Sequence, residues 1–271
     1  MKLYYQWIEW SYHHQVAKEI LPNFNLKIEE LIGLDSFEKC WDKLWDDKLL
    51  LLATENSYAW PIYPNLYKFN NWNAQIIWEF DLPINHCICS TQSKISEITK
   101  VYSHFKALPQ CHNYLKEKGI LNEEIVSDTA WAAKLISKTK EKWAAAICSE
   151  YAANLYGLNI LDRNIQDQKD NTTRFIVIKT NNTDIEYSDK KNKTTILFEA
   201  KDVKSSLKKC LDVFDKYNIN LTKIESLPNI KKAFTYLFWL DFEWNVDDKN
   251  VQECLTKLWE QTETLKVIWS Y

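Results

Sequence analysis

Short polar side chains recur in this 271-residue chain at places where helices and strands are predicted to begin or end. The positions are Ser11, Glu55-Asn56-Ser57, Ser103-His104, Gln110, Thr129 and Thr173-Arg174. Each group taken alone is typical of a helix cap or a turn. Together they favour a polar cleft that is rich in neutral hydrogen-bond donors, and helix N-termini at such a cleft attract anions. The sequence therefore predicts a site for a small carboxylate ligand.

The sequence lacks the motifs of several common catalytic sites. No segment matches a phosphate-binding P-loop, a zinc-ligand spacing or a Ser-His-Asp arrangement. Adjacent His13 and His14 are typical of a solvated helix face, so we expect neither a metal nor a cofactor. The seven cysteines are scattered and odd in number, which indicates reduced, structural thiols.

The composition is that of an ordinary folded protein, with 46% hydrophobic and 26% charged residues. The net charge of −3 comes without a basic stripe, so nucleic acid is not an expected partner. There is no apolar run long enough to span a membrane and no signal-peptide pattern. We therefore expect no membrane association and a cytoplasmic location.

The first two thirds of the chain alternate between predicted strands and predicted helices, which favours a mostly parallel α/β sheet. The strands are expected at 2–6, 49–53, 74–80, 84–89 and 174–178. The helices are expected at 11–20, 37–44, 105–118, 129–137 and 147–156. Ser127 is the predicted N-cap of the fourth helix, and Gly119 and Gly157 follow the third and fifth.

The pattern changes after a polar segment, 180–193, that is typical of a linker or hairpin. Strands at 195–199, 221–225, 234–242 and 265–268 and helices at 207–214 and 251–258 follow. This is the β-α-β-β-α-β order of a ferredoxin-like domain. We therefore predict one domain over 1–179, a linker over 180–193 and a second domain over 194–271.

Two neighbouring segments carry a specific pattern. Asn164-Ile165-Gln166-Asp167 is followed by Asn171-Thr172-Thr173-Arg174-Phe175, and together they resemble the signature of the prephenate dehydratase family, which ends in Thr-Arg-Phe. Further segments similar to family blocks are Glu55-Asn56-Ser57, Val101-Tyr102-Ser103-His104, Gln110-Cys111 and Leu155-Tyr156-Gly157-Leu158. Asn220–Ser226 resembles the family's regulatory ACT domain. The resemblance implies a two-lobed dehydratase domain, similar to periplasmic binding proteins, followed by a ferredoxin-like ACT domain.

The resemblance also implies an activity, the decarboxylative dehydration of prephenate to phenylpyruvate in phenylalanine biosynthesis. By resemblance Thr173 is the catalytic donor, and Asn56, Ser103 and Gln110 bind or orient the substrate, with Ser11, Ser57 and Thr129 as further binding candidates. Arg174 either pairs with a substrate carboxylate or braces its loop. Two alternatives stay open: use of arogenate, the amino form of the substrate, and a catalytically dead descendant that binds amino acids as a regulator.

The ACT-like region departs from the family at its phenylalanine site. The family has a Gly-Ala-Leu turn and a Glu-Ser-Arg-Pro segment there, and this chain has Ser205-Ser206-Leu207 and Glu225-Ser226-Leu227-Pro228. Leu227 replaces a charged side chain that has up to five N–H donors. We therefore expect weak or absent inhibition by phenylalanine, and an ACT domain that serves mainly as a dimer or tetramer interface.

The chain has thirteen tryptophans and only three glycines. Glycine is normally about 7% of residues, so roughly 19 are expected here. Trp7, Trp10, Trp45, Trp60, Trp78, Trp131, Trp244 and Trp269 stand where the family commonly has glycine. Trp41 and Trp239 stand where it has other aromatic residues, and Trp72, Trp143 and Trp259 are unassigned. An aromatic-rich core or a sugar-stacking surface would explain the tryptophan surplus but not the glycine deficit. Our hypothesis is that the source reads UGA codons as glycine.

This hypothesis predicts the mass of the native protein. Protein purified from its own cells should be lighter than 32.2 kDa by the Trp-to-Gly difference at several positions, as measured by intact-mass spectrometry. The gene should carry UGA at Trp7, Trp10, Trp60 and Trp244 but UGG at Trp41 and Trp239. A native mass that matches thirteen tryptophans would contradict the hypothesis.

Overall fold

The computed structural model describes residues 1–6, 9, 11–21, 28–44, 48–58, 60–71, 73–180 and 193–270. Contacts divide the chain into two compact units, one of residues 1–65 and 79–179 and one of residues 66–78 and 180–271. Residues 66–78, which the sequence places in the first domain, thus belong to the second unit. Most of the predicted linker lies outside the described residues, and the predicted domain limits stay a prediction. No helix of the described residues is long and apolar enough to cross a membrane.

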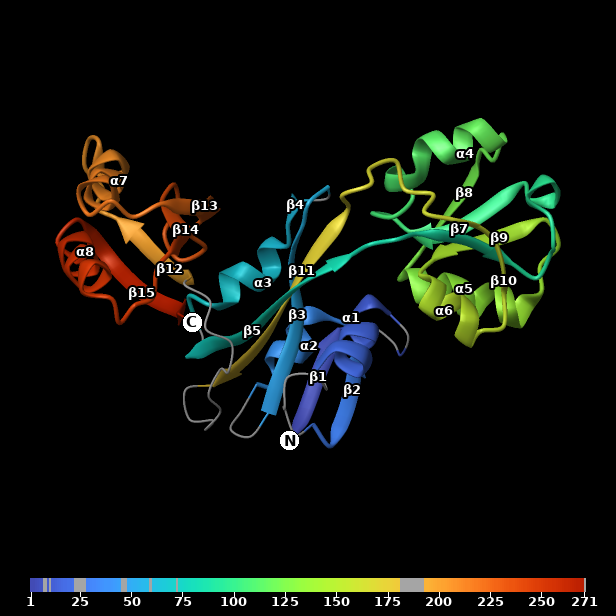
Figure 1. The fold of residues 1–271 in the computed structure, drawn as a ribbon, viewed down its shortest axis with the longest axis horizontal. Helices are drawn as coiled ribbons and strands as arrows, with labels where there is room; N and C mark the ends of the chain where they lie inside the picture. The colour runs from blue at the N-terminus through green and yellow to red at the C-terminus, as the bar shows by residue number, and fades with distance from the viewer. Residues whose placement is uncertain are drawn as a thin grey trace. The chain divides into compact units, whose positions relative to one another are not determined.

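The first sheet has the strand order β2-β1-β3-β11-β5, with β4 beside β3 (Figure 1). The strands are β1 (Lys2–Gln6), β2 (Glu30–Leu34), β3 (Lys48–Asn56), β4 (Trp60–Pro61), β5 (Ala74–Pro83) and β11 (Thr172–Thr180). The helices that follow β1, β2 and β4 are α1 (Tyr12–Gln15), which continues as a π-helical segment over Val16–Ile20, α2 (Phe37–Trp41) and α3 (Tyr63–Lys68). β2, β1 and β3 are parallel, whereas β11 returns antiparallel to β3. The predicted apolar strand is confirmed, because Leu49–Leu52 of β3 are fully buried.

The second sheet has the order β10-β6-β9-β7-β8. Its strands are β6 (Cys87–Ser90), β7 (Lys100–His104), β8 (Asn122–Val126), β9 (Ala144–Cys148) and β10 (Asn159–Arg163). Neighbouring residues of one strand pack on opposite faces: Cys87 and Cys89 lie in the cluster with α5 (Thr129–Thr139) and α6 (Glu150–Leu155). Ile88 lies in the cluster on the other face, with α4 (His112–Lys118). Figure 1 shows α4 on one side of this sheet and α5 and α6 on the other.

Several sequence predictions in this region were wrong. The sheets are mixed rather than mostly parallel, because β11, β6 and β10 run antiparallel to their neighbours. The helix predicted over 147–156 begins only at Glu150, and its first residues belong to β9. Alanine favours helices, yet Ala144–Cys148 is a fully buried central strand, so packing outweighs the local preference. The helix predicted from residue 105 begins at His112, after a 3₁₀ turn at Pro109–Cys111.

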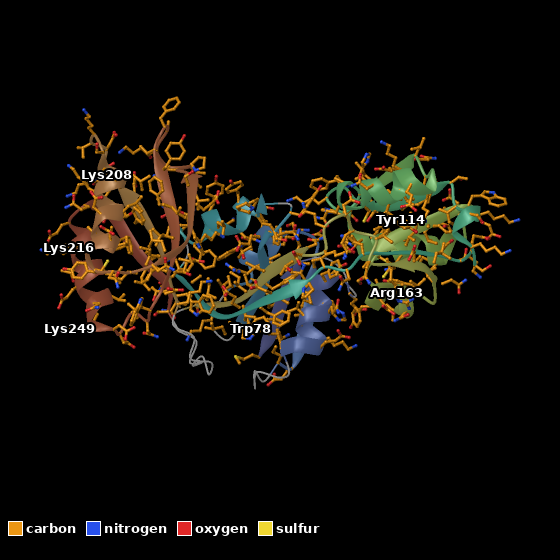
Figure 2. All side chains as sticks on the ribbon, turned by 45° about the horizontal axis from the view of Figure 1, so that its top comes forward. Trp78, Tyr114, Arg163, Lys208, Lys216 and Lys249 are labelled. Carbon is orange, nitrogen blue, oxygen red and sulfur yellow. The ribbon has the colours of Figure 1, made fainter. Side chains whose placement is uncertain are left out.

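The second unit contains a four-stranded antiparallel sheet in the order β13-β14-β12-β15. The elements are β12 (Lys193–Ala200), α7 (Ser206–Lys216), β13 (Leu221–Pro228), β14 (Tyr236–Glu243), α8 (Lys249–Trp259) and β15 (Thr262–Ser270). This confirms the predicted β-α-β-β-α-β order. Both helices pack one apolar face on the sheet, while Lys208, Lys216 and Lys249 project outward from them (Figure 2).

The predicted regulatory positions differ in their surroundings. Ser205, at the start of α7, has a φ of +64°, in the left-handed region that suits glycine. Leu227 is fully buried and lies opposite Leu237 on β14. Leu207 and Glu225 are half-buried and Ser226 is exposed. Ser205 thus has a backbone that suits glycine and Leu227 is an uncharged core residue, while the phenylalanine site stays a prediction.

The described tryptophans differ in their backbone conformation and burial. Trp41 is fully buried and its Nε1 donates to Asn65 Oδ1 at 3.3 Å, while Trp239 Nε1 donates to the buried carboxylate of Asp241 at 3.0 Å. These are ordinary core tryptophans. Trp143 and Trp244, in contrast, have φ of +67° and +91° and exposed rings. Few residues other than glycine adopt such φ values. Of the other positions that match family glycines, Trp131 is helical and Trp78 and Trp269 lie buried in strands, so their backbones do not call for glycine.

Trp244→Gly should raise the free energy of unfolding by about 1 kcal/mol, since it removes a bulky side chain from a left-handed backbone. The measurement is urea unfolding of the purified protein. The matched control is Trp259→Gly, which removes another exposed ring, from the end of α8. That variant should lose about 0.5 kcal/mol, because glycine is a poor helix former. A loss of stability in Trp244→Gly would contradict the view that this backbone suits glycine.

Candidate active site

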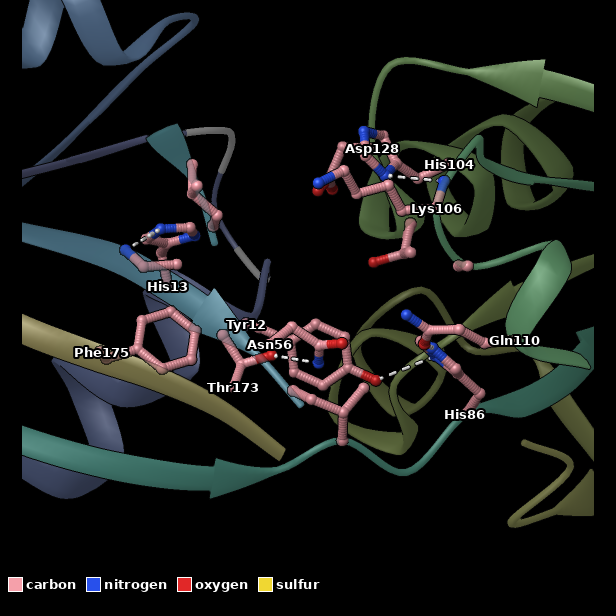
Figure 3. A pocket seen from close by; sticks show the side chains of 15 residues that line it. Tyr12, His13, Asn56, His86, His104, Lys106, Gln110, Asp128, Thr173 and Phe175 are labelled. Atoms are coloured by element: carbon pink, nitrogen blue, oxygen red, sulfur yellow. Dashed lines mark hydrogen bonds between the residues drawn. The ribbon is translucent and has the colours of Figure 1, made fainter. Parts of the chain in front are cut away.

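A cavity of about 150 Å³ lies between the two sheets of the first unit (Figure 3). Its polar lining groups come from both sheets, and apolar side chains form the rest of its walls. The described lining residues are Tyr12, His13, Ala53, Asn56, Ile62, Ile84, His86, His104, Lys106, Ala107, Gln110, Asp128, Thr129, Thr173 and Phe175. Four residues predicted from the sequence, Asn56, Gln110, Thr129 and Thr173, are therefore brought together here.

Thr173 is positioned by the pairing of β11 with β3. It lies opposite Asn56, and a β-bulge between Arg174 and Phe175 shifts the register by one residue. Asn56 Nδ2 donates to Thr173 Oγ1 at 2.9 Å. Among the described residues no acceptor is in reach of the Thr173 hydroxyl hydrogen. The hydroxyl thus accepts from the protein and has its own proton left for a ligand.

The orientation of the Asn56 amide is determined by the main chain. The backbone N–H of Tyr58 can only donate, and it donates to Asn56 Oδ1 at 3.0 Å. Nδ2 must therefore face the other way, where it donates to Asn171 Oδ1 at 2.8 Å as well as to Thr173. Asn171 Nδ2 in turn donates to Gln110 Oε1 at 2.8 Å.

Gln110 is the end point of this chain of amides. Its Oε1 already accepts from Asn171, so His86 Nε2, 2.9 Å away, must carry a hydrogen and donate as well. With both donors on the oxygen, the two Nε2 hydrogens of Gln110 have no acceptor among the described residues. Figure 3 shows this nitrogen directed into the cavity. It is available to a carboxylate or carbonyl oxygen of a ligand.

His86 is buried and uncharged. Burial lowers the pKa of His86 to about 4, so the ring is neutral at physiological pH. Because Nε2 carries the hydrogen, Nδ1 is an acceptor, and the Tyr12 hydroxyl lies 3.2 Å from it. The main chain of His86 is held by the signature segment: Gln166 Oε1 accepts its N–H at 2.9 Å and Ile165 N–H donates to its carbonyl at 3.0 Å.

The expectation that His13 and His14 form a solvated helix face was wrong, because both are buried. Ala53 N–H donates to His13 Nε2 at 3.2 Å, and the ring packs edge-on against Phe175 with centroids 4.9 Å apart. Burial lowers the pKa of His13 to about 3, which keeps it neutral. His13 is thus part of the cavity wall.

A second wall comes from the sheet that carries β7 and α5. His104, Lys106 and Asp128 lie together there (Figure 3). Burial, followed by the charge of Lys106, lowers the pKa of His104 to about 4. The N-cap of α5 is Asp128 and not the predicted Ser127: the Asp128 Oδ1 accepts from the N–H groups of Ala130 at 2.8 Å and Trp131 at 3.3 Å.

Three predicted serines lie outside the described cavity lining. Their hydroxyls bond main-chain groups and so hold neighbouring turns and strands. Ser11 caps α1 by accepting from His14 N–H at 3.4 Å, Ser57 accepts from Thr172 N–H at 3.0 Å and donates to Asp170 O at 2.9 Å, and Ser103 donates to Ile147 O at 2.7 Å. Their proposed contacts with substrate stay predictions.

Arg174 points away from Thr173 and Phe175, because successive residues of a strand face opposite sides. Its guanidinium lies 2.7 Å from Glu55 Oε1 and 3.2 Å from Asp81 Oδ1. These ion pairs tie β11 to its neighbouring strands. They favour bracing over substrate binding, the two alternatives that the sequence left open.

Sequence reasoning missed several residues that the fold brings to the site: Tyr12, His86, Lys106, Asp128 and Asn171. Asn171 stood within the signature segment, and Asp128 next to the predicted cap. His86 was assigned to a strand over 84–89, whereas β6 begins at Cys87. The polar pair Asn85-His86 between two apolar runs was the signal that the strands are interrupted there.

Comparisons with known proteins identify the family of this chain. The family model described as prephenate dehydratase matches residues 3–183. The bifunctional chorismate mutase/prephenate dehydratase of Aquifex aeolicus is 39% identical over 82% of this chain, which spans 60% of that protein's length. Arogenate dehydratase 2 of Petunia hybrida is 35% identical over the whole chain and 71% of that protein. A crystal structure of prephenate dehydratase from Arthrobacter aurescens in complex with L-Phe is 21% identical. It shares the fold, with a TM-score of 0.85 over 100% of this chain and 90% of that one.

The neutral state of His86 predicts a loss of stability in acid. A lowered histidine pKa means that the unfolded chain binds more protons than the folded chain below about pH 6.5. Stability is therefore full above that pH and falls as the pH drops toward 4. His86→Gln removes the titrating ring. Between pH 7 and pH 5 the free energy of unfolding of this variant should therefore fall by about 1–2 kcal/mol less than that of the wild-type protein.

Urea unfolding at the two pH values measures this difference. The matched control is His112→Gln, on an exposed residue of α4, for which we expect the wild-type loss. If His86→Gln and the wild-type protein lose equal stability, His86 is not held neutral by burial.

Proposed function

Because the chain belongs to the prephenate dehydratase family, we propose that its first unit converts prephenate to phenylpyruvate by decarboxylative dehydration. In this reaction the bond from the ring to its carboxylate breaks and CO₂ leaves. The electron pair of that bond enters the ring and expels the ring hydroxyl, which takes up one proton and departs as water. The ring becomes aromatic, and this supplies the driving force.

The observation that carries the proposal is the free hydrogen of the Thr173 hydroxyl. Loss of hydroxide is the difficult step, and a donor directed at the departing oxygen lowers its barrier. Thr173 accepts from Asn56, which leaves its own proton for that oxygen. A threonine is a weak acid, so its contribution is an oriented hydrogen bond to the departing oxygen.

The remaining groups of the cavity bind the charged end of the substrate. Gln110 offers two amide hydrogens whose direction is determined by Asn171 and His86. Lys106 lines the same cavity and supplies a positive charge for a carboxylate. The alternative of a catalytically dead regulator is less favoured, since Thr173, Asn56 and Gln110 are present and hydrogen-bonded in one cavity.

For the second unit we propose assembly into a dimer or tetramer and weak phenylalanine binding. The left-handed backbone at Ser205 supports a turn of the family type. The uncharged, buried Leu227 supports weakened recognition of phenylalanine, because a charge-assisted hydrogen bond is worth about 1.5–3 kcal/mol.

Replacement of Thr173 tests the proposal. Thr173→Ala should lower kcat for phenylpyruvate formation by roughly 100-fold or more, the scale of a lost proton or hydrogen-bond donor. Thr173→Ser keeps the hydroxyl and should stay within about tenfold of the wild-type kcat. The assay uses protein that carries tryptophan or glycine at each disputed position, as determined by mass spectrometry of the native protein. A wild-type protein inactive on both prephenate and arogenate would contradict the proposed function, and an active Thr173→Ala would contradict only the role of Thr173.

A further inference from the structure

Asp128 has one carboxylate oxygen to spare. Its two short hydrogen bonds, from Ala130 and Trp131 N–H, end on Oδ1, and the backbone N–H of Thr129 also faces the carboxylate. The residue is 93% buried, with 7% of its surface exposed, and it lines the cavity. Among the described residues no lysine, arginine or histidine forms an ion pair with it. No side chain of the described residues bonds Oδ2, so this oxygen is available to a ligand.

The neighbours of Asp128 do not neutralise it. His104 lies on the same wall, and burial holds its pKa near 4, so it carries no charge at neutral pH. Lys106 is charged but forms no ion pair with any described residue. Tyr12, also in the lining, has its pKa raised by burial, so its hydroxyl keeps its proton. Burial raises the pKa of Asp128 to about 6, so at pH 7 the group is still mostly ionised.

A cation and a carboxylate that do not pair with each other thus lie on one wall of the cavity (Figure 3). This is the arrangement that recognises an α-amino acid, whose carboxylate meets the lysine and whose ammonium meets the aspartate. Thr173 lies on the other sheet, so a ligand whose hydroxyl contacts Thr173 directs its opposite end toward this wall.

The two forms of the proposed substrate differ at that end. The keto form, prephenate, has a carbonyl oxygen, which only accepts hydrogen bonds, as does the Asp128 carboxylate. The amino form, arogenate, has an ammonium group with three N–H donors and a positive charge. A carboxylate facing this position repels the first group and binds the second.

We propose that Asp128 is a specificity-determining residue: its free carboxylate oxygen binds the α-ammonium group of the amino form and so favours arogenate over prephenate in this cavity. The inference rests on the proposed function, since it assigns a substrate form to the same site. Asp128 takes no part in breaking bonds in either substrate.

Asp128→Asn tests the inference. Asparagine caps helices as well as aspartate does and has nearly the same shape, so α5 and the cavity keep their structure. The substitution removes the negative charge and provides an N–H group that can donate a hydrogen bond to the keto oxygen. The ratio of kcat/KM for arogenate to that for prephenate should fall by roughly 10- to 100-fold, the scale of one charge-assisted hydrogen bond.

The matched control is Asp248→Asn, the same substitution at the N-cap of α8 in the second unit, which should leave the ratio unchanged. If Asp128→Asn does not fold, Asp128→Ser, another capping residue without charge, should show the same fall. A folded variant with an unchanged ratio, or a wild-type enzyme that turns over prephenate but not arogenate, would overturn the inference. A wild-type protein inactive on both substrates would instead contradict the proposed function.

Discussion

The candidate site depends on one backbone hydrogen bond, from Tyr58 N–H to Asn56 Oδ1. A main-chain N–H has a single possible role, so this bond determines which way the Asn56 amide faces. Every polar group that follows, Asn171, Gln110 and His86, then has only one arrangement in which each donor meets an acceptor. This series of hydrogen-bonded side chains runs from Thr173 to Gln110. At one end the Thr173 hydroxyl hydrogen faces the cavity, and at the other end the two amide hydrogens of Gln110 do. Such a site needs no rearrangement to receive an anion.

Burial determines the charge of this site. The histidines in its wall are neutral because solvation of the imidazolium form is lost inside the protein. They therefore serve as shaped hydrogen-bonding groups and contribute no positive charge. The charges that remain at neutral pH in the described lining are those of Lys106 and Asp128, and their separation gives the cavity a polarity along one wall. A ligand with both signs of charge at one end matches this polarity better than a ligand with negative charge alone.

The backbone at Trp143 and Trp244 raises a different constraint. A left-handed conformation is set by the path of the chain between packed elements, and the side chain at that position must tolerate it. Tryptophan tolerates it poorly, whereas Trp41 and Trp239 occupy well-packed positions with partners for their indole nitrogens. Of the described positions predicted to be glycine, Trp244 alone has this backbone, so the recoding hypothesis stays a prediction for the others.

The sequence alone determined the element types with strong periodicity or clear end signals: the apolar strand over 49–53, the β-α-β-β-α-β order, and the glycine that ends α4. It also identified Thr173, Asn56 and Gln110 as candidate site residues, because they occur within segments that resemble the family's. Only the tertiary structure decided that Ala144–Cys148 is a strand, since burial between two helical layers outweighs the helix preference of alanine. Only it placed His86 and Asp128 at the cavity. Their roles depend on partners distant in sequence and on the loss of water around them. The local pattern of residues indicates neither.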